Sequence, residues 1–134
     1  MQTLTIAAKQ TITGKITDRI KTFEDACREL GIQQAELTVS GELEPDFKSI
    51  SAHGKLIIIA RALNEGWKPN WSNNSEYKYF PWFDLSSGSG LSYLDCDCQH
   101  SHSIVGSRLC FKSKELAIYA GKQFIDIYTD FFII

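Results

Sequence analysis

The chain has 134 residues, of which 43% are hydrophobic and 22% are charged, and its formal net charge is −2. This length and composition suit one globular domain with its own hydrophobic core, so we expect residues 1–134 to form a single domain. The balanced charge, without an acidic or basic tail, argues against strong capture of duplex nucleic acid, which needs a dense basic face.

Residues 1–16 contain loosely alternating Thr and Ile, and they predict a short strand or an arm that orders only when packed. A short helix is predicted over residues 22–31. Thr22 and Asp25 resemble a capping box at its start, with Asp in place of the usual Glu or Gln. Gly31 is a natural residue for the end of this helix.

A polar connection closed by Pro45 is expected over residues 32–46, and a second helix over residues 47–65. Gly66 ends this helix and Pro69 prevents it from resuming. The helix has a wide apolar surface, which indicates burial on more than one side. That surface consists of Leu56, Ile57, Ile58, Ile59, Ala60 and Leu63.

The aromatic run YKYFPWFDL over residues 77–85 predicts the first strand. Because proline cannot donate to a ladder, this strand must be an edge strand or be bulged at Pro81. Residues 86–90, SSGSG, read as a turn, and a second strand starts at residue 91. The polar segment 95–103 either extends that strand or forms a loop.

A third strand is predicted over residues 105–112, and a last helix over residues 114–131 with Ser113 as its N-cap. Gly121 lies within this helix, where glycine costs about 1 kcal/mol relative to alanine. A close approach to another backbone is a reasonable cause. The predicted order is therefore α-α-β-β-β-α.

Strands that follow one another in sequence pair as an antiparallel meander. We therefore predict the α+β class, with a three-stranded antiparallel β-meander packed against helices.

The chain lacks the features of a membrane or secreted protein. Its longest central apolar run, Leu56–Ala60, is much shorter than the roughly 18 residues that span a bilayer. The first ten residues lack the basic start and long apolar stretch of a secretion signal. We predict a cytoplasmic protein without membrane contact, and its four cysteines as thiols.

Three stretches are similar to a family of short bacterial proteins without an established activity, which are often found in prophages and other mobile elements. They are ALNEGWKPNW (62–71), YKYFPWF (77–83) and VGSRLCFKSKELAIYAGKQF (105–124). The placement of Trp, Gly and Arg in these stretches is unusual. The resemblance implies a genomic context of phage or mobile-element origin, and it implies no catalytic residues.

Four metal-ligand residue types alternate in one short segment: Cys96, Cys98, His100 and His102. On an extended strand they would share one face and span roughly 20 Å at about 3.3 Å per residue. Zinc ligands converge within about 2.3 Å of the ion, so a turn in the segment would be required. We assign no metal and no cofactor, and keep a small structural-zinc protein as one alternative.

Seven aromatic side chains lie between residues 67 and 83. Alternation along the first strand places Lys78, Phe80 and Trp82 on one face, and that face could lie exposed beside Arg108 and Lys112. Exposed aromatics flanked by cations suit single-stranded nucleic acid or a protein interface. The alternative is that both faces are covered and these aromatics belong to the core.

No combination of residues indicates catalysis. Cys110 could meet His100 or His102 across a hairpin, but buried strand cysteines are usually inert. The GSG sequence at 88–90 is followed by neither GK[ST] nor a helix, so it is not a phosphate loop. We therefore predict that the protein is not an enzyme.

The function predicted from sequence is a protein-interaction module with an unknown protein partner, and the first alternative is a single-stranded nucleic-acid-binding accessory protein. The binding residues predicted for the two readings are Phe80, Trp82, Arg108, Lys112 and Lys78.

Overall fold

The computed structural model of the protein describes residues 14–33, 41–86 and 91–134. The helices are α2 (Ile16–Arg19), α3 (Phe23–Leu30), the 3₁₀ helix η1 (Gly41–Asp46), α4 (Phe47–Leu63), α5 (Lys114–Gln123) and α6 (Ile125–Phe132). The strands are β1 (Lys78–Asp84) and β2 (Ser92–Gln99). The α+β class is confirmed. None of the helices in these ranges has both the length and the apolar character of a membrane-spanning helix.

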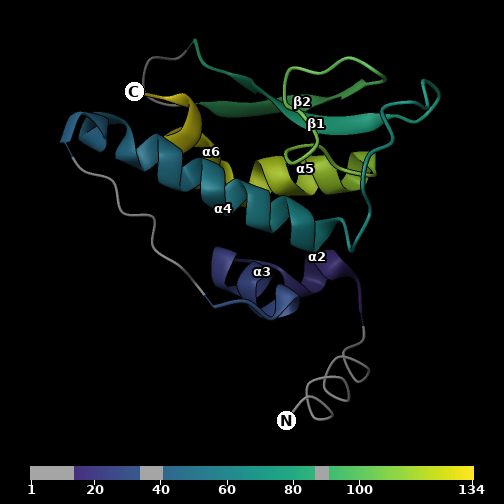
Figure 1. Ribbon diagram of the computed structural model, residues 1–134, viewed down its shortest axis with the longest axis horizontal. Coiled ribbons are helices and arrows are strands. Elements are labelled where there is room, and N and C mark those ends of the chain that lie inside the picture. Colours follow the sequence, from purple (N-terminus) through teal and green to yellow (C-terminus); the bar gives the residue numbers. More distant parts are fainter. Residues whose placement is uncertain (1–13, 34–40, 87–90) are drawn as a thin grey trace.

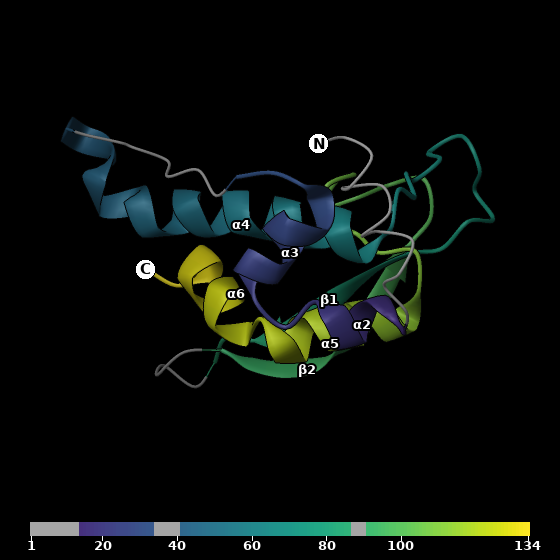
Figure 2. The same cartoon turned by 90° about the horizontal axis from the view of Figure 1, so that it is seen from below.

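The elements are arranged in layers. Figure 1 shows the β1–β2 hairpin on one side of α4, α5 and α6, with α2 and α3 on the other side of α4. Figure 2 shows α4 running alongside α5 and α6, with α2 and α3 in front of them. The hydroxyl of Tyr119 and the side chain of Gln123, both on α5, donate to the carbonyls of Ile20 and Lys21. These bonds hold the junction between α2 and α3 against α5.

The predicted N-terminal strand or arm lies mostly outside the described residues, which begin at Gly14. At its end the strand prediction is wrong, because Ile16 starts α2 and is buried. Burial of Ile16 and Ile20 against the core explains why this short segment is ordered as a helical turn.

The capping box of α3 is confirmed. The Thr22 hydroxyl accepts from the Asp25 N–H at 3.1 Å, and the Asp25 carboxylate accepts from the Thr22 N–H at 3.1 Å. The pKa of Asp25 is lowered by hydrogen bonds from the Lys21 N–H and the Arg28 side chain, and to a smaller extent by those with Thr22. Gly31 ends the helix with φ 66°, a left-handed conformation that favours glycine.

Helix α4 starts at the predicted residue and ends at Leu63, two residues before the predicted end. Its apolar surface is wide, although Ile57 and Ile58 are only partly buried, and it contacts both α3 and α6. Its buried residues are Ala52, Leu56, Ile59, Ala60, Ala62 and Leu63. The polar connection before it ends in η1, which contains Pro45. Burial on two sides makes α4 the central helix of the fold.

Strand β1 pairs with β2 in antiparallel register, and the segment 95–103 contributes its first five residues to β2. The N–H and C=O of Tyr79 both bond to Phe111, at 3.0 and 2.7 Å. Successive residues of a strand point their backbone groups to opposite edges. The N–H and C=O groups of Lys78 and Phe80 therefore point toward β2, whereas the backbone nitrogen of Pro81 lies at the opposite edge. The missing N–H of Pro81 therefore costs no ladder bond. The bulge lies between Trp82 and Phe83.

The predicted third strand and the meander are wrong. Within the described ranges the sheet has two strands, and the segment 105–112 contributes only the isolated bridge from Phe111 to Tyr79. This bridge joins β1 rather than the neighbouring β2. On the other side of the segment, the Asn64 carboxamide donates to the Cys110 carbonyl at 2.9 Å and accepts from the Lys112 N–H at 3.0 Å. A side-chain amide thus replaces the backbone of a further strand.

The predicted last helix is split in two at Phe124, whose φ of −110° and ψ of 28° depart from helical values. Phe124 is buried in the core, and no Pro or Gly lies at the break. Ser113 caps α5 as predicted, its hydroxyl accepting from the Leu116 N–H at 3.3 Å. A close approach at Gly121 is confirmed, but to side chains rather than to the predicted backbone: a Cβ there would lie 2.7 Å from the Tyr93 ring and 2.8 Å from the Pro81 side chain.

Candidate functional site

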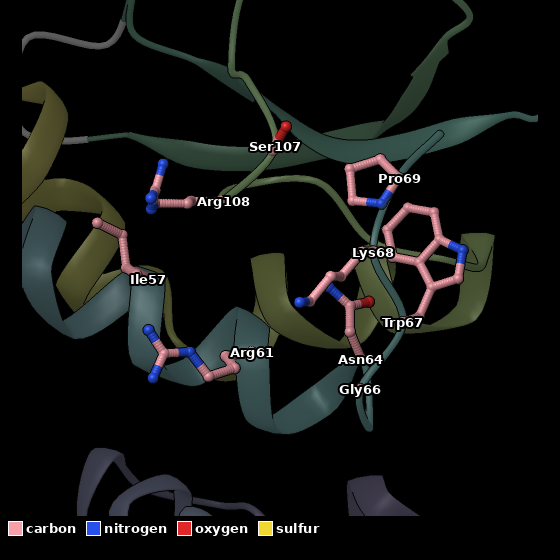
Figure 3. A pocket seen from close by; sticks show the side chains of 9 residues that line it. All are labelled: Ile57, Arg61, Asn64, Gly66, Trp67, Lys68, Pro69, Ser107 and Arg108. Atoms are coloured by element: carbon pink, nitrogen blue, oxygen red, sulfur yellow. The ribbon is translucent and has the colours of Figure 1, made fainter. Parts of the chain in front are cut away.

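A groove of about 700 Å³ opens between the C-terminal end of α4 and two loops that are distant in sequence. Figure 3 shows the side chains around it, with Arg61 from α4, Arg108 from the second loop and Trp67 at the opposite end. The lining residues are Ile57, Arg61, Asn64, Gly66, Trp67, Lys68, Pro69, Ser107 and Arg108. This volume lies within the roughly 300–1,000 Å³ typical of ligand sites.

The first wall is formed where α4 ends. Glu65 and Gly66 have φ values of 50° and 88°, so two successive left-handed residues reverse the chain. The Trp67 N–H donates to the Asn64 carbonyl at 3.0 Å and closes this turn. A non-glycine residue in the left-handed region costs about 1–3 kcal/mol, and such residues cluster at functional sites. The turn brings Trp67 and Lys68 back alongside the end of α4.

The second wall, Ser107 and Arg108, is held by hydrogen bonds on both sides. The Trp71 indole N–H donates to the Ser107 hydroxyl at 2.6 Å. After Arg108, the Asn64 carboxamide binds the backbone of Cys110 and Lys112. Asn64 is itself buried and belongs to the first wall, so one side chain connects the two walls.

Lys78 lies behind this site. Its side chain is 0% exposed, and its ammonium donates to the carbonyls of Asn73 at 3.1 Å and Glu76 at 3.0 Å. The ammonium also lies 3.4 Å from the Glu76 carboxylate and 5.1 Å from the centre of the Trp71 ring. These contacts hold the loop that carries Trp71, and through it Ser107. The prediction that Lys78 is a surface cation is wrong, because loop residues cover it.

The groove concentrates positive charge. Arg61, Lys68 and Arg108 are exposed, and none of them forms an ion pair with an acid in the part of the chain that the structure describes. No acidic residue lines the groove. Three cations around one concave surface repel one another unless an anion binds among them. The arrangement therefore favours an anionic ligand.

The other predicted site residues are dispersed. Lys112 is outside the groove lining and pairs with Glu65 at 3.5 Å. Phe80 is 5% exposed, so the expectation that it lies on the surface is wrong. Trp82 is 45% exposed and its ring lies 6.2 Å from that of Phe80. Of the five predicted residues, only Arg108 lines the groove.

Sequence reasoning missed Arg61, Trp67 and Lys68. A signal was present, because two stretches with an unusual placement of Trp, Gly and Arg, 62–71 and 105–124, supply most of the groove lining. The unusual placement of Gly66 and Pro69 around Trp67 indicates a specific turn rather than a general loop. Arg61 could only be added once the end of α4 was placed beside that turn.

The Cys and His residues of β2 and of the segment that follows it do not converge. His100 shares a 3.0 Å hydrogen bond with the Asn74 carbonyl and packs edge-on against Tyr77. Over residues 14–33, 41–86 and 91–134, no three His, Cys, Asp or Glu side chains are grouped to hold a metal ion. The zinc alternative therefore has no ligand set in this geometry.

Cys110 is buried, and its thiol donates to the Ser107 carbonyl at 3.6 Å. Burial raises the pKa of Cys110 to about 11. The thiol is therefore protonated at neutral pH and is a poor nucleophile. Its position between Ser107 and the Asn64 contact indicates a packing role behind the second wall.

Comparisons with known proteins found no matching family model, no matching curated protein and no matching solved structure. The function is therefore argued from the groove itself.

Proposed function

We propose that the protein binds single-stranded nucleic acid through the basic groove. The observation that carries this proposal is the meeting of Arg61, Lys68 and Arg108 around a concave surface that also contains Trp67 and has no acidic residue in its lining, the nearby Glu65 being paired with Lys112. Proteins that bind single strands combine a positively charged groove, which follows the phosphates, with aromatic side chains on which bases stack. The groove offers both components within one nucleotide-sized space.

The charge distribution favours a single strand over a duplex. The chain as a whole carries a formal net charge of −2, so its attraction for phosphate is confined to the groove. A duplex presents a rigid array of phosphates and is captured by a broad basic face. A flexible strand can instead follow a short basic groove, with its affinity set by a few contacts.

The proposal is tested with a fluorescently labelled oligothymidylate titrated at low and at high salt. Each phosphate contact contributes a slope of about −0.7 to the dependence of log affinity on log salt for a single strand. The variant Arg61→Gln with Arg108→Gln should reduce affinity at least tenfold and make this slope shallower by about 1.4, which corresponds to two lost contacts.

The matched control removes the same charge elsewhere. Arg28→Gln with Lys48→Gln also deletes two cations, both on exposed side chains outside the groove. This control should change affinity by less than a factor of about two, as expected for a screened long-range effect. Equal losses in the two double variants would refute the groove assignment. Absence of salt-sensitive binding in the wild type would refute the function.

A second candidate is the protein-interaction function, carried by the outer side of the hairpin. Trp82 and Leu94 are 45% and 60% exposed there, in a region where residues 79–99 contain three Asp and no Lys or Arg. Exposed apolar side chains among like charges suit a basic, apolar partner segment. A photo-crosslinker in place of Leu94 tests this: Trp82→Ala should abolish crosslinking to the partner while leaving the fold intact. Undiminished crosslinking would exclude Trp82 as an anchor.

A further inference from the structure

The three tryptophans of the chain differ in what occupies their rings. Both the indole N–H and the ring of Trp71 have partners, because the N–H donates to Ser107 and the Lys78 ammonium lies over the ring. Trp82 lies beside Phe80, and its partner in the register of the hairpin is Asp95, an acidic residue that would repel phosphate. Neither ring is placed to accept a nucleic-acid base next to bound phosphates.

Trp67 is in a different situation. It lines the groove and is partly exposed, and among the described residues its ring has no aromatic partner and no cation over it. In Figure 3 its ring lies beside that of Pro69, and Arg61 and Arg108 lie at the opposite end of the groove. A flat apolar surface therefore faces the same space as the unpaired cations.

We propose that Trp67 is the stacking platform for one unpaired base, so that the groove selects single strands that carry bases over duplexes and over bare phosphate chains. This inference rests on the proposed function, which supplies the phosphate contacts. A base can reach the ring only when it is not paired and stacked within a duplex. Phosphates on either side of that base would then reach Arg61, Arg108 and Lys68.

The position of Trp67 is set by the turn that precedes it rather than by a flexible loop. Glu65 and Gly66 adopt left-handed conformations, and the Trp67 N–H is bonded to the Asn64 carbonyl. Pro69 restricts the backbone just after it. A ring held in this way loses little conformational entropy on binding, which favours stacking.

The experiment compares two probes of equal length and equal charge: an oligothymidylate of eight nucleotides, and an eight-unit abasic chain with the same sugar–phosphate backbone. The wild type should bind the oligothymidylate about tenfold more tightly, within the range measured for stacking of one base on an aromatic side chain. Trp67→Leu should lose this preference while its affinity for the abasic chain stays unchanged. Trp67→Phe, which retains a ring, should restore part of the preference.

Trp82→Leu is the matched control and should leave both affinities unchanged, because Trp82 lies outside the groove. Equal affinity of the wild type for the two probes would overturn the role of Trp67 and leave the proposed function standing. Failure of the wild type to bind either probe at low salt would overturn both. If Trp67→Leu does not fold, equal affinity of the wild type for the two probes still overturns the role of Trp67, and a preference that Trp67→Phe weakens and Trp82→Leu leaves unchanged supports it.

Discussion

The outer edge of β1 and the outer edge of β2 are closed in different ways. At β1, Tyr79 bonds to Phe111 through both backbone groups, and the Asn64 side chain holds the far side of that segment. At β2, the carboxylates of Asp95 and Asp97 accept the N–H groups of the residues that follow them, at 2.8 and 2.7 Å. One edge is covered by distant parts of the chain, and the other by its own side chains.

The difference shows that the long-range backbone contacts of the hairpin are made at the β1 edge. Unpaired strand edges invite pairing with other chains, and both devices prevent it. The covering of β1 does more, because the segment that bonds to Tyr79 also carries Ser107 and Arg108 into the groove. The hydrogen bonds at the β2 edge join neighbouring residues, so they do not position a distant segment of the chain. We therefore expect changes at the β1 edge to affect both stability and binding, and changes at the β2 edge to affect neither strongly.

The largest effect is expected for Asn64→Leu. This change removes two hydrogen bonds and leaves the Cys110 carbonyl and the Lys112 N–H without their partner. A buried polar group left unsatisfied costs about 1–3 kcal/mol, so the free energy of unfolding should fall by about 3 kcal/mol. Urea denaturation measures this change.

The control for Asn64 is Asn74→Ala. Asn74 is exposed, and its interaction with His100 uses the backbone carbonyl, which the substitution retains. Its free energy of unfolding should change by less than about 0.5 kcal/mol. A similar, small effect of both substitutions would show that Asn64 does not hold the β1 edge segment.

Asn64 also explains why the third strand could not be predicted. Residues 105–112 alternate in sequence, but in the structure Leu109, Cys110 and Phe111 are all buried. Strand identity, however, depends on the partner that accepts the backbone bonds, and here that partner is one bridge residue and one side chain 46 positions away from Cys110. Local patterns carry no information about such a partner. A capping box depends on near neighbours and a helical glycine on a steric rule, so the cap at Thr22 and a close approach at Gly121 could be predicted, but not which groups approach Gly121.

The candidate site was likewise predicted only where its residues could be recognised from local sequence. Arg108 was identified as a cation near aromatic residues, but Arg61 and Lys68 join it only through the turn at the end of α4. Alternation along β1 predicted one face for Lys78, Phe80 and Trp82, of which Trp82 is exposed and the other two are buried. It could not show that loop residues cover Lys78, because coverage depends on chain segments outside the strand.

Gly121→Ala comes next in expected size, and it tests whether both strands rest on α5 as one unit. An added Cβ would approach Tyr93 of β2 and Pro81 of β1 to within 2.8 Å, so α5 must move away from the hairpin. Overpacking costs about 1–3 kcal/mol, and the better helix propensity of alanine offsets about 1 kcal/mol of this. A net loss of up to about 2 kcal/mol is expected by thermal or urea denaturation.

Gly54 provides the matched control, since it also lies within a helix but has no atom within 4 Å of an added Cβ. Gly54→Ala should therefore stabilise the protein by up to about 1 kcal/mol. If both alanine variants are stabilised, α5 does not press on the hairpin at Gly121.

A smaller, pH-dependent effect is expected from Cys110 at the β1 edge. The thiol has its pKa raised from 9.0 to about 11 by burial, so between these values the unfolded chain releases its proton first. The folded state then binds more protons than the unfolded state, and stability falls as the pH rises. Between pH 9 and 10.5 the wild type should lose on the order of 1 kcal/mol more than Cys110→Ala. Urea denaturation at both pH values checks this, and parallel losses would contradict it.

The smallest effect on stability, and the sharpest test of the comparison, concerns the β2 edge. Asp95→Ala with Asp97→Ala removes two exposed carboxylates that engage only the amides of Cys96 and Cys98. The free energy of unfolding should change by less than about 0.5 kcal/mol per site, as is usual for exposed positions. Self-association should nevertheless increase, because the freed amides and the loss of like charge permit edge-to-edge pairing. Sedimentation velocity over a range of concentrations measures this.

Asp95→Asn with Asp97→Asn separates the two contributions at this edge, since asparagine keeps the side-chain oxygen that accepts from the backbone N–H and removes only the charge. Self-association of the asparagine pair that matches the wild type would assign protection to the hydrogen bonds, whereas association that matches the alanine pair would assign it to the charge. An alanine pair that sediments like the wild type at every concentration would show that the carboxylates do not protect the edge. In that case the protective role that we assign to both edges of the hairpin would hold at most for the β1 edge.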